Sequence, residues 1–141
     1  MKSLYTTYGD SYFGSDEKVQ CDDKQIDVKL SSPGSNKPGI NPEQLFACGY
    51  SSCYGMAIKY VAKELGIELK DYQVHADVEL HKDESGFFFK TTLDVHMPSD
   101  MSSNNIAKLI NAAHKICPYS RAIKNNLKVA TKVNGTELHS H

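Results

Sequence analysis

The chain has 141 residues, of which 40% are hydrophobic and 23% are charged; this predicts a single domain over residues 1–141 with a moderate core. The net charge of −1 offers no basic surface for nucleic acid or an anionic membrane. Met1–Tyr5 lacks the apolar run of a signal peptide, and no stretch reaches the roughly 18 apolar residues of a membrane span. We therefore expect a cytoplasmic protein.

Strands are expected in the N-terminal part, residues 1–31. There, Ile26–Leu30 alternates apolar and polar side chains, the period of a half-buried strand. Residues 31–39 are rich in Ser, Pro and Gly, a composition typical of a loop.

A long helix should follow this loop. Asn41 is a favourable N-cap, and Gln44, three residues later, completes a variant of the capping box. Gly66 suits a left-handed C-cap, so the helix should end near Leu65. Its apolar residues fall on one wide stripe, and we expect a central helix buried on most sides: Leu45, Gly49, Cys53, Met56 and Tyr60, widened by Phe46, Ala57 and Val61.

The second half of the chain predicts a long β-hairpin followed by helices. Residues 72–81 and 87–97 alternate in polarity on either side of a turn at residues 83–86. A second helix is expected over residues 103–116, Pro118 should open a short third one, and residues 127–133 read as a last strand. The fold class is therefore α+β, with antiparallel strands and helices segregated on one face.

Two of the four cysteines stand in segments suited to redox chemistry. Cys53 lies in the first predicted helix and Cys117 follows the second, too far apart for a Cys-x-x-Cys motif or a zinc knuckle. Cysteines in a reducing compartment are expected to be free or catalytic. An attacking and a resolving thiol would need the fold to bring them together. We interpret Cys21 and Cys48 as small apolar packing residues.

A reactive thiol needs a positive neighbour. Cys117 has one candidate, the positive end of the helix that begins at Pro118. Cys53 has none in its own segment, and Glu43 would raise its pKa unless a cation intervened. The six histidines show no metal-site spacing, so we predict no metal and interpret them, His75 and His81 included, as surface residues.

These segments closely resemble the Ohr branch of the Ohr/OsmC family, the organic hydroperoxide resistance proteins. The resemblance extends over the whole chain in the same order, and two separate motifs each keep their cysteine. It is carried by Asn41–Ala47, Gly49–Tyr50, Cys53 and Cys117–Ser120, and also by Met1–Thr6 and Ile26–Leu30.

The resemblance implies a thiol peroxidase that reduces small organic or lipid hydroperoxides. Cys53 would attack the O–O bond and become a sulfenic acid, and Cys117 would condense with it to a disulfide. An external dithiol, typically the lipoyl group of a lipoylated protein, would reduce that disulfide, so no bound cofactor is expected. The implied assembly is an intertwined homodimer, with antiparallel sheets wrapped around central helices and sites at the subunit interface.

The chain departs from the family at one important position. The family holds its thiolate with an arginine paired to the glutamate that matches Glu43, whereas here Ser15 stands at the arginine's expected place. Lys18, on the same segment, and Arg121, the only arginine of the chain, are the candidate replacements. The departure leaves an alternative open: a non-enzymatic member of the fold that binds hydrophobic ligands or senses oxidants through a slow thiol.

Overall fold

The computed structural model describes residues 1–140; His141 lies outside the described residues. The chain forms two compact units, Met1–Leu45 and Phe46–His141, and helix α1 (Pro42–Leu65) begins in the first and continues through the second. Within the described residues, no helix is both long enough and apolar enough to cross a membrane.

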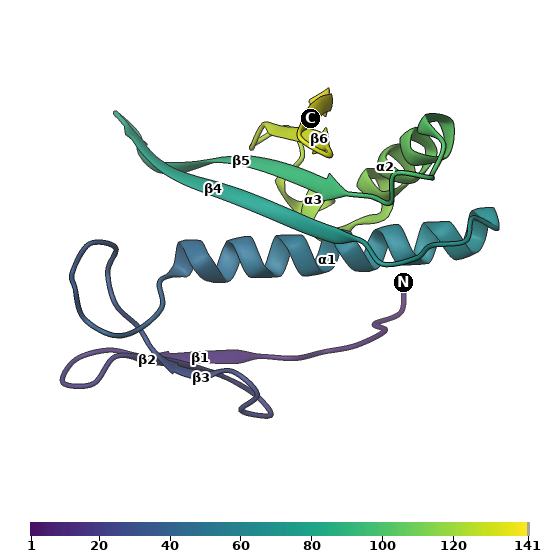
Figure 1. Cartoon of the computed structure of the whole chain (residues 1–141). Coiled ribbons are helices and arrows are strands. Elements are labelled where there is room, and N and C mark those ends of the chain that lie inside the picture. The colour runs from purple at the N-terminus through teal and green to yellow at the C-terminus, as the bar shows by residue number, and fades with distance from the viewer. Residues whose placement is uncertain (141) are drawn as a thin grey trace. The chain divides into compact units, whose positions relative to one another are not determined.

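The first unit contains a small antiparallel sheet in the order β1-β2-β3, seen in Figure 1. Its strands are β1 (Gly9–Tyr12), β2 (Lys18–Cys21) and β3 (Asp27–Lys29). The expected strands are therefore present but short, because turns interrupt residues 1–31. The predicted loop that follows is also confirmed, and a bridge between Leu30 and Ile40 closes it.

The start and end of α1 agree with the prediction. The backbone N–H of Gln44 donates to Asn41 Oδ1 at 2.8 Å, and the N–H of Asn41 donates to Gln44 Oε1 at 3.0 Å. This reciprocal pair is a capping box, and it satisfies backbone donors that the first turn leaves free. Gly66, with φ of 68°, supplies the left-handed residue after the helix ends at Leu65.

The second unit contains a four-stranded sheet in the order β4-β5-β6-β7. Its elements are β4 (Gln73–Asp83), β5 (Gly86–His96), α2 (Ser103–Ile116), α3 (Pro118–Ile123), β6 (Val129–Val133) and β7 (Thr136–Ser140). The hairpin and both helices are confirmed, whereas β7 was not predicted.

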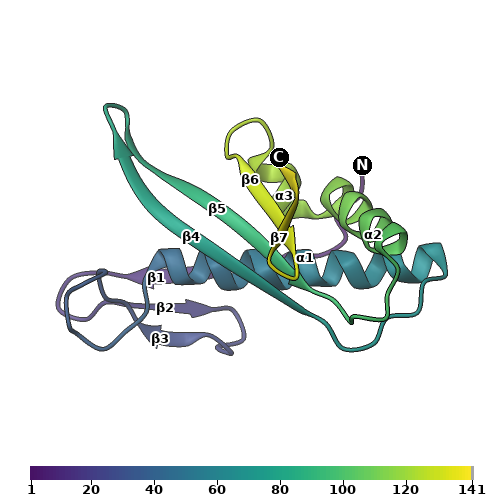
Figure 2. The ribbon, with the colours of Figure 1, turned by 45° about the horizontal axis from the view of Figure 1, so that its top comes forward.

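One strand pair in this sheet departs from the expected antiparallel pattern. Strand β6 runs parallel to β5, with Leu93 opposite Thr131. The reason is the connection between them: α2 and α3 carry the chain back before β6 begins, as a parallel pair requires. Figure 2 shows this crossover between the long hairpin and the two C-terminal strands.

The core of the second unit lies between α1, α2 and the sheet. On α1, Tyr50, Tyr54 and Ile58 are fully buried. They belong to the same core cluster as Leu93 and Val95 of β5. The other large buried side chains are Leu109, Ile110 and Val129.

The apolar stripe predicted for α1 is wrong in part. Met56 is 73% exposed and Tyr60 is 60% exposed, whereas Tyr50 and Tyr54 are fully buried. The apolar residues of α1 are spread around most of its circumference. The sequence pattern alone therefore could not show which side of the helix the strands of the same chain would cover. In the single chain, α1 is therefore not buried on most sides.

Candidate active site

The thiols of Cys53 and Cys117 lie together although the two residues are far apart in sequence. Cys53 is in the middle of α1, and Cys117 is both the C-cap of α2 and the N-cap of α3. Pro118 forces this junction, because it cannot continue a helix but suits a first helical position. The Cys117 thiol donates to Cys53 Sγ at a sulfur–sulfur distance of 3.6 Å.

The two thiols differ in exposure and in electrostatic setting. Cys117 is fully buried, whereas Cys53 is only partly buried. Burial raises the pKa of Cys53, and the neighbouring Cys117 thiol raises it further. One backbone hydrogen bond from Tyr119 acts in the opposite direction and lowers that pKa. The net pKa of Cys53 is raised, so in this chain alone the thiolate is not favoured.

The start of α3 makes a hydrogen bond to one of the two thiols through the backbone of Tyr119. Sequence reasoning assigned the positive end of this helix to Cys117. In the structure Cys117 is the N-cap of α3, and the N–H of Tyr119, in the first turn of α3, is directed to Cys53. The N–H of Cys117 itself donates back to Ala113 O at 2.8 Å. The helix start therefore stabilises negative charge on Cys53.

Aromatic rings from three elements surround this part of α1. The Tyr119 ring stacks on Tyr50, with centroids 6.0 Å apart, and lies 6.5 Å from Phe46. Phe46 in turn contacts Phe89 of β5 at 5.0 Å. Gly49 allows the approach, since its α-carbon faces the Tyr119 ring directly. The surroundings of Cys53 are thus mainly apolar.

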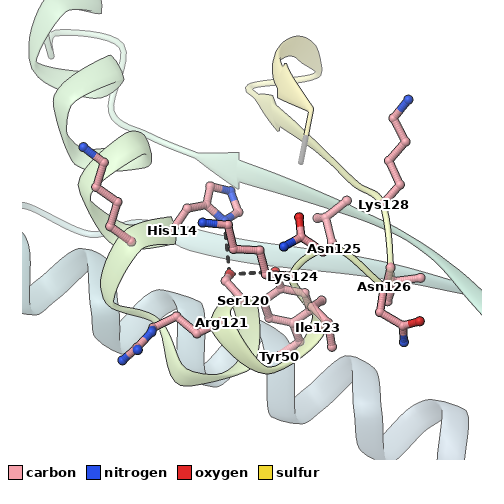
Figure 3. A pocket seen from close by; sticks show the side chains of 12 residues that line it. Tyr50, His114, Ser120, Arg121, Ile123, Lys124, Asn125, Asn126 and Lys128 are labelled. Atoms are coloured by element: carbon pink, nitrogen blue, oxygen red, sulfur yellow. Dashed lines mark hydrogen bonds between the residues drawn. The ribbon is translucent and has the colours of Figure 1, made fainter.

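A partly buried chain of hydrogen bonds joins Tyr50, Ser120, His114 and Thr131. The Tyr50 hydroxyl is 2.7 Å from Ser120 Oγ, which is 3.1 Å from His114 Nδ1. The other ring nitrogen, His114 Nε2, is 2.9 Å from Thr131 Oγ1. Figure 3 shows Tyr50, Ser120 and His114 facing one another.

This network corrects the interpretation of every histidine as a surface residue. His114 is only 5% exposed, although His75 and His81 do lie on the polar face of β4. The signal was available: His114 follows Ile110 by four residues and therefore shares its apolar helix face. Sequence reasoning also missed Tyr50 and Ser120.

A cavity of about 450 Å³ opens next to the network, and the thiols do not line it. Tyr50, His114 and Ser120 form part of its wall, as Figure 3 shows. Its lining also contains four cationic residues: Lys115, Arg121, Lys124 and Lys128.

The candidate cations and Glu43 occupy different parts of the chain. Arg121 is exposed on α3, and its guanidinium points away from the Ser120 hydroxyl in Figure 3. Lys18 lies on β2 of the first unit, with Nζ 5.5 Å from the centre of the Tyr12 ring. Glu43 stands in the first turn of α1, and its Oε2 is buried without a hydrogen-bond partner among the described residues.

The remaining cysteines are not where the prediction placed them. Cys48 is exposed, which contradicts its interpretation as a packing residue. Cys21 is half-buried, and its thiol donates to Asp23 Oδ1 at 3.0 Å and accepts the N–H of Ile26 at 3.2 Å. Ligand atoms of Cys21, Asp22 and Asp23 lie within 4.8 Å of one another, but the two contacts of Cys21 serve to close the turn after β2.

Comparison with known proteins identifies the family of the chain. Residues 33–132 match the OsmC-like protein family. The chain is 39% identical to the organic hydroperoxide resistance protein OhrB of Bacillus subtilis over 132 residues, 90% of this chain and 96% of the relative. It is 34% identical to the organic hydroperoxide resistance protein of Xanthomonas axonopodis pv. citri over 133 residues, 91% and 93% of the two chains.

Solved structures show the same fold. The crystal structure of Bacillus subtilis OhrB matches with a TM-score of 0.84 at 38% identity, covering 93% of this chain and 99% of that one. An organic hydroperoxide resistance protein from Elizabethkingia anophelis matches with a TM-score of 0.88 at 33% identity, covering 94% and 98%. The chain therefore belongs to the Ohr/OsmC family, in its Ohr branch.

Proposed function

We propose that this protein is a cysteine peroxidase that reduces organic hydroperoxides and so protects against oxidative stress. The observation that carries the proposal is the 3.6 Å separation of the Cys53 and Cys117 sulfurs, held by elements from distant parts of the chain. Relatives named organic hydroperoxide resistance proteins, similar over about nine-tenths of the chain, support the same function.

Cys53 is the attacking residue in this proposal because it is the more exposed of the two thiols. Its thiolate attacks one oxygen of the hydroperoxide, and the O–O bond breaks. The other oxygen leaves as an alkoxide and takes up a proton to give the alcohol, while Cys53 becomes a sulfenic acid.

Cys117 is the resolving residue because it is buried and already in contact with Cys53. Its sulfur forms the S–S bond as the S–O bond of the sulfenic acid breaks, and the hydroxyl leaves with the Cys117 proton as water. A dithiol such as a lipoyl group then reduces the disulfide by exchange and is itself oxidised to a disulfide. This cycle needs no bound cofactor or metal.

The apolar surroundings favour an organic substrate. The rings of Phe46 and Tyr119, both partly exposed, lie 6.5 Å apart between their centres and form an apolar surface in the unit that holds Cys53. Such a surface gains free energy by removing an alkyl or acyl chain from water, at roughly 25 cal/mol per Å². Hydrogen peroxide has no such chain.

A homodimer is part of the proposal. Within the second unit, several large apolar side chains remain exposed in the single chain, among them Met56, Tyr60 and Phe87. A second copy that covers them would complete the burial of α1 and would bring a second set of charged residues toward the sites. Interfaces of such obligate pairs bury about 2,000 Å² or more.

Two observations favour a different function. The pKa of Cys53 is raised by burial, and Ser15 stands where the family has its arginine. A slow thiol of this kind suits a protein that binds hydrophobic ligands or senses oxidants without turnover.

A peroxidase assay separates the two functions. The purified protein is given tert-butyl hydroperoxide or a lipid hydroperoxide, with dihydrolipoamide or glutathione as reductant. The proposal predicts repeated turnover with the organic peroxides and faster turnover with the dithiol. Absence of turnover with every peroxide–reductant pair would support the binding or sensing function instead.

A further inference from the structure

Helix α3, which Cys117 caps, is too short to be stable by itself. Helix α3 has six residues, none of them buried, and its N-cap Cys117 makes no side-chain capping bond. A single helical turn and a half is unstable in isolation, so its position depends on tertiary contacts.

Ser120 supplies polar contacts of this kind. Its Oγ lies 2.7 Å from the Tyr50 hydroxyl on α1 and 3.1 Å from His114 Nδ1 on α2. Thr131 on β6, fully buried, holds the other side of the His114 ring at 2.9 Å. One hydroxyl therefore ties α3 to two helices directly and to the sheet through His114, as Figure 3 shows for the helix contacts.

Burial keeps the Tyr50 hydroxyl in its neutral, hydrogen-bonding form. Tyr50 is fully buried, and that burial raises its pKa to about 12. The bond to Ser120 lowers this pKa, and the negative charges that Cys117 and Cys53 can carry raise it. The phenol therefore keeps its proton and its bond to Ser120 through neutral pH.

Two groups at the start of α3 act on Cys53, and both lie within three residues of Ser120. Cys117 Sγ is 3.6 Å from Cys53 Sγ, and the N–H of Tyr119 bonds to Cys53. A disulfide requires the sulfurs at about 2.05 Å, so α3 must stay close enough for a movement of about 1.5 Å to close the bond. A loosened α3 would weaken both interactions together.

We propose that Ser120, held by Tyr50 and His114, is a positioning residue that sets the thiolate stability of Cys53 and the ease of the Cys53–Cys117 disulfide. The proposal relies on the peroxidase function above for the roles of the two thiols. Its test, however, measures the thiols themselves and does not depend on peroxide turnover.

The experiment uses the full chain with Cys21→Ser and Cys48→Ser, so that only Cys53 and Cys117 remain. In this background Ser120→Ala is compared with Ser120→Thr, which keeps a hydroxyl, and with Tyr50→Phe, which removes the partner hydroxyl. The matched control is Tyr54→Phe, which removes a buried hydroxyl bonded to Ile110 O at 2.9 Å on α2. That bond does not involve α3.

Two quantities are measured: the Cys53 pKa, from the pH dependence of alkylation, and the dithiol–disulfide equilibrium against dithiothreitol. Loss of one hydrogen bond of about 1 kcal/mol corresponds to roughly a fivefold change in the disulfide equilibrium constant. We expect Tyr50→Phe, which loses one bond, to lower that constant by about this factor, and Ser120→Ala, which loses two, to lower it by at least as much. Both variants should raise the Cys53 pKa. Ser120→Thr should remain closer to the background than Ser120→Ala.

The control decides between positioning and general loosening. Tyr54→Phe should lower the free energy of unfolding yet leave both thiol quantities unchanged. The proposal is overturned if Ser120→Ala and Tyr50→Phe leave both quantities at background, or if Tyr54→Phe changes them equally. If Ser120→Ala does not fold, Tyr50→Phe provides the same test from the other end of the bond.

Discussion

Gly49 and Tyr119 are in direct contact: a Cβ built on Gly49 would lie 2.7 Å from the Tyr119 hydroxyl oxygen and 3.0 Å from its ring. The helix turn at Gly49 therefore leaves the room that the Tyr119 side chain occupies. Since the N–H of the same tyrosine bonds to Cys53, this glycine influences the thiol through α3.

Gly49→Ala should accordingly destabilise the protein, although alanine is the better helix former by about 1 kcal/mol. The Tyr119 ring stacks on Tyr50, so displacing it should cost more than that gain, for a net loss of about 1–3 kcal/mol in the free energy of unfolding. Gly55→Ala is the matched control on the same helix, because its Cβ would meet Val74 at an ordinary 3.5 Å. Urea unfolding measures both, and a Gly49→Ala variant as stable as Gly55→Ala would contradict the packing argument.

Removing each of the two thiols should change the reaction with peroxide in a different way. Cys53→Ser should abolish peroxide consumption, since no nucleophile remains. Cys117→Ser should allow one turnover and then over-oxidation, because an unresolved sulfenic acid proceeds to sulfinic acid. Mass spectrometry after one equivalent of peroxide distinguishes the products. Cys48→Ser, an exposed cysteine on the same helix, is the control. Full activity in Cys53→Ser would disprove the assignment.

Local signals in the sequence predicted most of the elements. The capping box at Asn41 and Gln44, the alternation of the hairpin and the break at Pro118 each depend on neighbours a few residues apart. The fold around the site depends on other information. That β6 would run parallel to β5 follows from where the chain returns after α3.

The site shows the same division. The family resemblance implied that Cys53 and Cys117 act as a pair, but no spacing rule could place them 3.6 Å apart. The hydrogen bonds of Ser120 join side chains from α1, α2 and α3. No pattern in the sequence of these segments indicates that the three side chains meet. The sequence indicated only the burial of His114, because this residue lies on the apolar face of its helix.

Alkaline pH should reveal the buried phenol of Tyr50. Its pKa is about 12 in the folded chain and 10.0 when unperturbed. Below pH 10 both states keep the proton, so the group contributes nothing to the pH dependence. Above pH 10 the unfolded chain releases the proton first, and the free energy of unfolding falls as pH rises toward 12. Tyr50→Phe should flatten this fall in urea titrations at pH 9 to 11, relative to Tyr60→Phe on an exposed ring. An unchanged slope would contradict the burial of the Tyr50 hydroxyl.

The exposed arc of α1 predicts self-association. Met56, 73% exposed in the single chain, should be covered in a homodimer. A buried charge at such a position is costly, so Met56→Glu should raise the dimer dissociation constant at least about tenfold. Lys63→Glu changes charge on the same helix at an already polar position and should have less effect. Sedimentation at low micromolar concentration reads both, and an active, folded monomer of the unmodified chain would contradict the dimer.

The Cys53 thiolate needs a nearby positive charge. Burial raises the pKa of Cys53, and the bond from Tyr119 offsets only part of that rise. Glu43 Oε2 is buried without a hydrogen-bond partner among residues 1–140, which leaves a carboxylate able to accept a cation. We therefore expect an active enzyme to bring a positive group to Cys53, and Lys18 and Arg121 are the candidates.

If one of these residues supplies that charge, Lys18→Met or Arg121→Met should raise the Cys53 pKa and slow peroxide reduction, because the thiolate loses its counter-charge. Each variant has a matched control: Lys29→Met, directly opposite Lys18 in the β2–β3 pair, and Lys124→Met, which lines the same cavity as Arg121. The pH dependence of alkylation gives the pKa, and stopped-flow consumption of tert-butyl hydroperoxide gives the rate. A residue that acts at the site should change both quantities while its control changes neither. Should neither variant differ from its control, and the unmodified chain also react slowly, the binding or sensing function becomes the better account of Cys53.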